Sequence, residues 1–99
     1  MAVEVVWLDQ AKDDLREILD FIAKDNAFAA LTYVEGIERA RSKLADFPDA
    51  GPVYKSRFRW IIFRNHLIFY NHDTERRTVS IAAVIDGRRD MRRLFPEMD

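Results

Sequence analysis

The spacing of the apolar residues changes near Pro52, from three and four before it to two after it. The early apolar residues that would share one face of an α-helix are Ala11, Leu15, Ile18, Leu19 and Ile22. After Pro52, apolar and polar residues alternate, as in Phe58, Arg59 and Trp60, which is the period of a β-strand. Helices in one half and strands in the other predict an α+β fold.

Two helices are expected before Pro48. Asp9 is a suitable N-cap for the first helix, which runs for about four turns until the polar link at Lys24–Asn26. The second helix spans about 27–46, with Asn26 as its cap. Its buried stripe is expected to consist of Ala30, Leu31, Val34, Ile37, Ala40 and Leu44. The short link makes the two helices antiparallel neighbours, an αα-hairpin.

Strands complete the expected element order β-α-α-β-β-β. They cover residues 3–7, 57–62, 67–70 and 78–85. The last strand is apolar on both faces at its end, which places it centrally in the sheet. Phe58, Trp60 and Ile62 share one face, and Trp60 is expected in the core rather than free to stack on RNA bases. We therefore expect one domain, residues 1–99, in which a helical hairpin packs on a small, mainly antiparallel sheet.

Cysteine is absent from the chain, which excludes disulfide scaffolds, thiol catalysis and Cys-containing zinc sites. The N-terminus lacks the basic region and long apolar core of a signal peptide. No apolar run approaches the roughly 18 residues of a membrane span. These observations predict a soluble, cytoplasmic protein with no membrane partner.

The formal net charge of −1 conceals an asymmetry between the two halves. Residues 1–50 carry 6 Lys and Arg against 11 Asp and Glu, whereas residues 51–99 carry 10 against 6, and nine of those ten bases are arginine. Two interpretations remain open. Either the halves form oppositely charged surfaces without a special partner, or the basic half contacts an acidic protein segment or nucleic acid.

Titratable groups suited to catalysis are sparse. The only histidines, His66 and His72, fall at expected turns, where a solvated surface residue is the usual interpretation. No glycine-rich phosphate loop, metal-binding motif or catalytic-triad arrangement is present in the sequence. The sequence therefore predicts no metal site and no cofactor. A surface of arginines stays open, either to stabilise an anionic transition state, to hold an anionic partner, or to pair with the acidic helices: Arg57, Arg59, Arg64, Arg88, Arg89, Arg92 and Arg93.

The segment Asp86–Phe95 combines four arginines with an apolar end, Leu94 and Phe95. A helical turn or two is expected at 88–95. Two interpretations of this segment are open. Leu94 and Phe95 pack on the core, or the segment is an exposed anchor for another protein, with arginines flanking apolar hot spots.

The whole chain resembles the toxins of the ParE/RelE superfamily, which belong to bacterial toxin–antitoxin pairs. The residues that carry the resemblance are Val5-Val6-Trp7, Ala11, Asp14-Leu15, Ile18, Ala29-Ala30, Ile37, Leu44, Pro48, Gly51, Leu67-Ile68-Phe69-Tyr70 and Val84-Ile85-Asp86-Gly87-Arg88-Arg89-Asp90. Each motif is loose, but the full set in this order is specific. The stretch Asp86–Asp90, which follows the last expected strand, together with Leu94 and Phe95 resembles ParE members in particular.

The resemblance separates two activities. RelE-type members are ribosome-dependent mRNA endonucleases that use lysines, arginines and a C-terminal tyrosine. When the sequences are aligned on the strand that ends in Tyr70, the two lysine positions fall on Trp60 and Ile62, the neighbouring arginine position on Leu67 and the tyrosine position near Phe95. Of the RelE-type catalytic residues, only the arginine that precedes the C-terminal segment remains, as Arg88 or Arg89. Trp, Ile and Leu supply no acid, base or cation, and Phe has no hydroxyl.

The resemblance to ParE members therefore implies a toxin that is not an enzyme. Such toxins poison DNA gyrase through protein contact, without binding nucleic acid directly. We assign target binding to Arg88, Arg89, Arg92, Leu94 and Phe95.

A ParD-like antitoxin is also implied, whose C-terminal segment wraps the toxin to give a hetero-oligomer. We assign its contacts to Arg57, Arg59 and Trp60, because the basic half suits an acidic peptide. Two alternatives stay open. One is an mRNA interferase of RelE type that uses Arg57, Arg59, His66 and Arg89. The other is a binding module that has lost toxicity and is kept only as an antitoxin partner.

Overall fold

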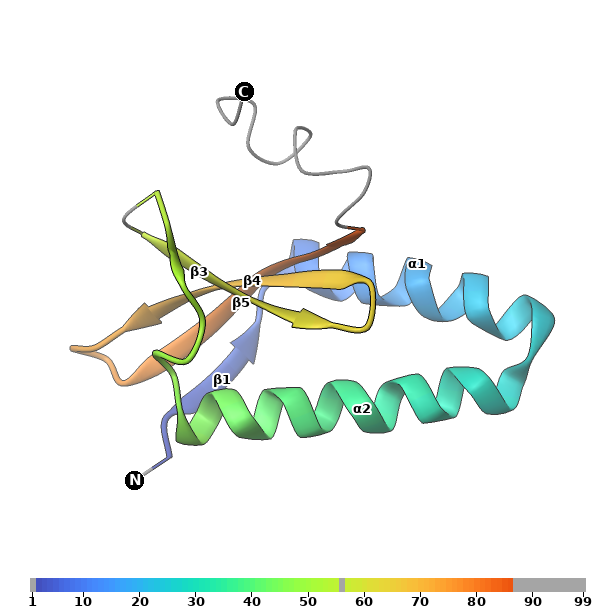
Figure 1. Cartoon of the computed structure of the whole chain (residues 1–99), viewed down its shortest axis with the longest axis horizontal. Helices are drawn as coiled ribbons and strands as arrows, with labels where there is room; N and C mark the ends of the chain where they lie inside the picture. The colour runs from blue at the N-terminus through green and yellow to red at the C-terminus, as the bar shows by residue number, and fades with distance from the viewer. Residues whose placement is uncertain (1, 56, 87–99) are drawn as a thin grey trace.

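A computed structural model of the chain describes residues 2–55 and 57–86. Within these residues, two helices pack on a five-stranded sheet of order β1-β5-β4-β3-β2 (Figure 1). The elements are β1 (Glu4–Trp7), α1 (Asp9–Asp25), α2 (Ala27–Asp46), β2 (Val53–Tyr54), β3 (Phe58–Phe63), β4 (His66–Asp73) and β5 (Thr78–Asp86). β1 runs parallel to β5, and the other neighbours are antiparallel. The α+β class, the helical hairpin and the interior position of the last strand are confirmed.

The helix ends agree with the prediction at one position and differ at another. The N-cap of α1 is Leu8, whose side chain makes no capping hydrogen bond, and Asp9 is the first helical residue rather than the cap. Asn26 caps α2 as predicted, since its side-chain oxygen accepts a hydrogen bond of 3.1 Å from Ala29 N. The Asn26 N–H also donates to Ile22 O, so this one extended residue ends α1 and begins α2.

The sheet has more paired backbone than the sequence predicted. β2 is an additional strand of two residues, antiparallel to the beginning of β3. β4 continues past Tyr70 through three polar residues that pair with the beginning of β5. Alternation of apolar residues marks only the part of a strand that faces a core, so the polar end of β4 was assigned to a turn.

Two apolar clusters lie on opposite faces of the sheet. The larger one, beneath the helices, contains the buried residues Ala11, Tyr33, Ile37, Leu44, Ile68, Tyr70, Val79, Ile81 and Val84. The smaller one contains Phe69, Ala83 and Ile85, with Tyr54, Trp60 and Leu67 packed against it. In β3, Ile61 and Phe63 pack on the larger cluster. Trp60 is therefore half-buried in the smaller cluster and not in the main core, and Ile62 is 64% exposed.

A bulge in β5 brings two apolar residues that are three positions apart to the same face of the sheet. Ala82 is an extra residue where the pairing with β4 shifts register between Phe69 and Tyr70. Residues three apart in a regular strand point to opposite faces. Because of the insertion, Ile81 and Val84 both lie beneath the helices.

Candidate functional site

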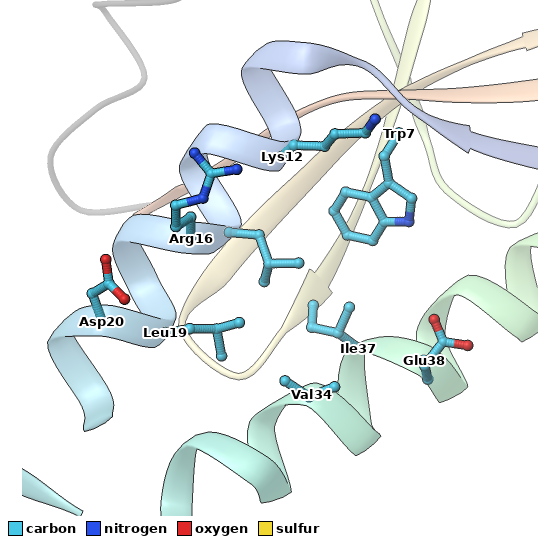
Figure 2. Close-up of a pocket in the computed structure, with 9 residues that line it drawn as sticks. Trp7, Lys12, Arg16, Leu19, Asp20, Val34, Ile37 and Glu38 are labelled. Carbon is cyan, nitrogen blue, oxygen red and sulfur yellow. The ribbon is translucent and has the colours of Figure 1, made fainter. Parts of the chain in front are cut away.

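A groove opens between α1 and α2, with the end of β1 at its base, and has a volume of about 490 Å³ (Figure 2). Its lining residues are Trp7, Lys12, Leu15, Arg16, Leu19, Asp20, Val34, Ile37 and Glu38. Figure 2 shows Trp7, Leu19, Val34 and Ile37 converging between the helices. An apolar floor between charged walls is suited to the apolar face of an amphipathic helix.

The two walls of the groove differ in charge. Lys12 and Arg16 stand on α1 four residues apart and thus on one face of the helix. Arg16 is 3.6 Å from the exposed Asp13, whereas Lys12 makes no ion pair with any residue that the structure describes. On α2, Glu38 is already paired with Arg41 at 3.0 Å. Asp20, one turn further along α1 than Arg16, adds a negative charge to the α1 wall, so the positive charge available to a partner lies at the Lys12 end.

Exposed apolar surface continues from the groove along α2 to the end of the hairpin. Val34, Leu31 and Phe28 follow one another at a spacing of three, and Leu31 and Phe28 are 64% and 76% exposed. Phe21, near the end of α1, is 72% exposed. Figure 1 shows that this end of the hairpin extends beyond the sheet. The prediction that Leu31 and Val34 are buried is therefore wrong.

The buried face of α2 is rotated from the predicted stripe because Gly36 allows a close approach to β3. A Cβ atom at Gly36 would collide with the ring of Phe63. Tyr33 packs edge-on against the same ring, with 5.0 Å between the ring centroids. Ile37, Ala40 and Leu44 of the predicted stripe do pack in the core, but glycine gives no hydrophobic signal, so the pattern missed the side of the helix that carries Tyr33 and Gly36.

The predicted antitoxin-binding residues lie at the beginning of β3, where Arg59 holds a loop of its own chain. Its Nη1 donates to the carbonyl oxygens of Gly51 at 2.7 Å and Asp49 at 3.3 Å, and its Nε lies 3.5 Å from Asp49 Oδ1. Arg57 is exposed, and Trp60 packs on the smaller cluster. The structure thus brings the three residues to one end of β3, but the Arg59 guanidinium is engaged within the chain.

His72 is not a solvated turn residue but part of β4, with a nearly buried side chain. Its Nδ1 donates a 2.7 Å hydrogen bond to Asp49 Oδ1, and this bond is the main cause of a lowered pKa of Asp49. The Tyr70 hydroxyl accepts a 3.0 Å hydrogen bond from Gly51 N, and burial raises the pKa of Tyr70. A Cβ atom at Gly51 would collide with the carbonyl group of Trp60, so the loop lies directly on the sheet.

His66 is the first residue of β4 and contacts α2. The Tyr33 hydroxyl and His66 Nδ1 share a hydrogen bond of 3.0 Å. Burial lowers the pKa of His66, while Asp86 acts in the opposite direction. Burial also raises the pKa of Tyr33 to about 12, against the effect of Arg64. Both groups are therefore neutral at pH 7, and the pair ties α2 to the sheet.

The groups of the RNA-cleavage alternative are not brought together among the described residues. His66 pairs with Phe63 at one end of the β3–β4 hairpin, and Arg59 pairs with Tyr70 at the other end. Four residues of strand, or about 13 Å, separate the two positions, which is too far for a shared proton transfer. The predicted helical turn at 88–95 and the predicted target-binding residues Arg88, Arg89, Arg92, Leu94 and Phe95 lie outside the described residues.

Residues 2–55 and 57–86 contain no group of three His, Asp or Glu side chains that is placed to hold a metal ion. In the same residues, no helix combines the length and the apolar character that are needed to cross a bilayer.

Comparisons with known proteins give the family. The model of the family described as the ParE toxin of the type II toxin–antitoxin system parDE matches residues 5–91. A comparison with curated proteins found no match. Among solved structures, a chain of the "Chromosomal ParDE TA system from P. aeruginosa" is similar with a TM-score of 0.70 at 18% identity, over 86% of this chain and 96% of that chain. That likeness shows the fold, and the family match over most of the sequence shows that the chain belongs to the ParE toxin family of type II toxin–antitoxin systems.

Proposed function

We propose that this protein inhibits DNA gyrase by protein–protein contact and is neutralised by a ParD-type antitoxin. The family match over residues 5–91 carries the proposal. A mechanism without RNA cleavage is supported by the separation of His66 from Arg59 along the β3–β4 hairpin. It is also supported by apolar residues at the RelE-type catalytic positions, such as the exposed Ile62. Both partners place the protein in the bacterial cytoplasm.

Gyrase inhibition is tested with the purified protein in a supercoiling assay. We expect relaxed or cleaved plasmid to accumulate as the toxin concentration rises. Normal supercoiling in an excess of folded toxin would contradict the proposal. In cells that express the chain alone, we expect growth arrest with altered plasmid topology and intact mRNA.

The same cultures separate the two alternatives. Fragmented mRNA with normal plasmid topology would establish an mRNA interferase, and the alignment of Trp60, Ile62 and Leu67 on the catalytic positions would then be wrong. Harmless expression of the folded chain would instead indicate a binding module that has lost its toxicity.

For the antitoxin, we place a helical segment in the groove between α1 and α2. The apolar floor, which includes Leu19 and Ile37, accepts the apolar face of one helix. Lys12 on the α1 wall favours carboxylates beside that face. The exposed Leu31 and Phe28 extend the contact surface beyond the groove. Arg57, Arg59 and Trp60 stay a prediction for a second contact on β3.

Substitution of Val34 tests the groove. Val34→Asp places a charge in the apolar contact, so we expect affinity for the antitoxin's C-terminal segment to fall by about tenfold or more. Thr74→Asp is the control, because Thr74 is exposed in the turn between β4 and β5 and belongs neither to the groove nor to β3. Calorimetric titration gives both affinities. Unchanged affinity of Val34→Asp would exclude the groove, and a loss confined to Arg57→Ala would move the contact to β3.

A further inference from the structure

A buried carboxylate on α1 belongs to none of the surfaces above. Asp14 is 5% exposed and is the one charged residue buried among the described residues. Its Oδ2 accepts a 3.0 Å hydrogen bond from the backbone N of Val84 in β5, and its Oδ1 accepts one of 2.9 Å from Gln10 Nε2. A carboxylate withdrawn from water is costly unless it is hydrogen-bonded. The burial of Asp14 beside β5 must therefore have a physical reason in the structure of that strand.

The reason is that β5 loses the strand that pairs with one of its edges. β1 pairs with β5 only as far as Ile81, and Leu8 N donates to Ile81 O before the chain enters α1. In a regular strand, the backbone N–H and C=O groups of every second residue point to the same edge. After Ile81, the next residue to face the β1 edge would be two positions on, but the inserted Ala82 moves this position to Val84. The Asp14 side chain thus supplies the acceptor that a continued β1 would have supplied.

The end of β5 is consequently held at both edges. On the other edge, β4 stays paired with β5 as far as His66 and Asp86. The chain continues from Asp86 into the segment that we assign to target binding, Arg88, Arg89, Arg92, Leu94 and Phe95. Of the described residues, Val84 and Asp86 are thus the last held ones before that segment in the chain.

We propose that Asp14 is a positioning residue for target inhibition: by accepting the Val84 N–H it holds the end of β5, which directly precedes in the chain the segment assigned to target binding. This inference rests on the proposed gyrase inhibition. Asp14 itself makes no contact with the target. Helix α1 then serves two partners, with Lys12 and Arg16 on the groove side and Asp14 on the sheet side.

Three variants test the role. Asp14→Ala removes the acceptor, and Asp14→Asn keeps an oxygen at the same place. Asp13→Ala is the matched control, because Asp13 is exposed on the same helix. The toxin concentration that half-inhibits gyrase, the affinity for the antitoxin segment and the hydrogen exchange of the Val84 amide are measured for each variant.

We expect Asp14→Ala to raise the half-inhibitory concentration by about tenfold or more, because an unsatisfied buried N–H lowers the population of the native β5 end by about that factor. Asp14→Asn and Asp13→Ala stay within about threefold of the wild type. Antitoxin affinity is unchanged in all three, which a general loss of stability would not allow. Val84 exchanges faster in Asp14→Ala alone.

Two results would overturn the inference. One is inhibition by Asp14→Ala equal to that of the wild type. The other is a wild-type Val84 amide that exchanges as fast as an exposed one, and this measurement decides the matter even if Asp14→Ala does not fold. A wild type that leaves gyrase unaffected would defeat the proposed function instead, while the exchange data still report whether Asp14 holds the end of β5.

Discussion

Tyr33 and His66 form a neutral pair that is joined by one hydrogen bond, between the Tyr33 hydroxyl and His66 Nδ1. The hydrogen bond of 3.0 Å joins residues 33 positions apart, and the bond between His72 and Asp49 spans 23 positions. No local pattern in a sequence reports contacts over such separations. Both histidines were therefore expected at solvated turns, although each links two elements of the fold.

The lowered pKa of His66 makes stability depend on pH. Burial disfavours the charged imidazole in the folded protein, whereas the unfolded chain has the ordinary value of 6.5. The unfolded chain therefore binds the proton more readily, and the free energy of unfolding decreases as the pH falls below 6.5. Urea unfolding at pH 7.5 and pH 5.5 measures this decrease. Asp49 contributes little in that range, because its pKa is lowered from an ordinary value of 3.8 by the hydrogen bond from His72.

His66→Gln is the comparison for this measurement. We expect the variant to lose less of its free energy of unfolding between the two pH values than the wild type does, because glutamine does not titrate. Parallel decreases in both proteins would show that the pH dependence arises elsewhere.

At the scale of elements, β3 shows where sequence patterns stop being informative. The strand reads FRWIIF, with apolar residues on both faces, so its orientation cannot be derived from alternation. Ile61 packs on the main cluster, and Ile62 on the other face is exposed. The helices were predictable in position because each has a clear polar face, yet the rotation of α2 followed from Gly36, which the pattern does not register.

Lysine substitutions on the two faces of β3 should have unequal effects. Ile61→Lys brings a charge against the main cluster, and we expect it to lower the free energy of unfolding by about 2–4 kcal/mol. Ile62→Lys replaces an exposed side chain and should change it by no more than about 0.5 kcal/mol. Urea unfolding of both variants checks the orientation of the strand, and the reverse order would contradict it.

At the scale of the whole molecule, the sheet is completed by a strand from the beginning of the chain. β1 pairs with β5, which lies more than seventy positions later, from Glu4↔Thr78 to Trp7↔Ile81. Val3 N also donates to Ala45 O at the end of α2 at 2.8 Å. A few residues of β1 thus connect the sheet, the helices and the floor of the groove.

Removal of residues 2–8 should abolish cooperative folding. The deletion takes Val3, Val5 and Trp7 from the main cluster and leaves the edge of β5 exposed. Glu4→Gln is the control, since Glu4 is exposed and its replacement keeps the strand. Thermal unfolding followed by circular dichroism distinguishes the two. A cooperative transition of the shortened chain near the wild-type midpoint would show that β1 is dispensable.

The pairing of β1 with β5 also determines when the sheet can be completed during synthesis of the chain. A ribosome adds about 5–20 residues per second, so the stretch from Trp7 to Thr78 takes it several seconds. Throughout that interval β1 has been made, while its partner strand has not. The finished sheet, and with it the end of β5 that Asp14 holds, exists only after β5 has been synthesised. During synthesis, β1 and the two helices are therefore made before the strand that connects them to the rest of the sheet.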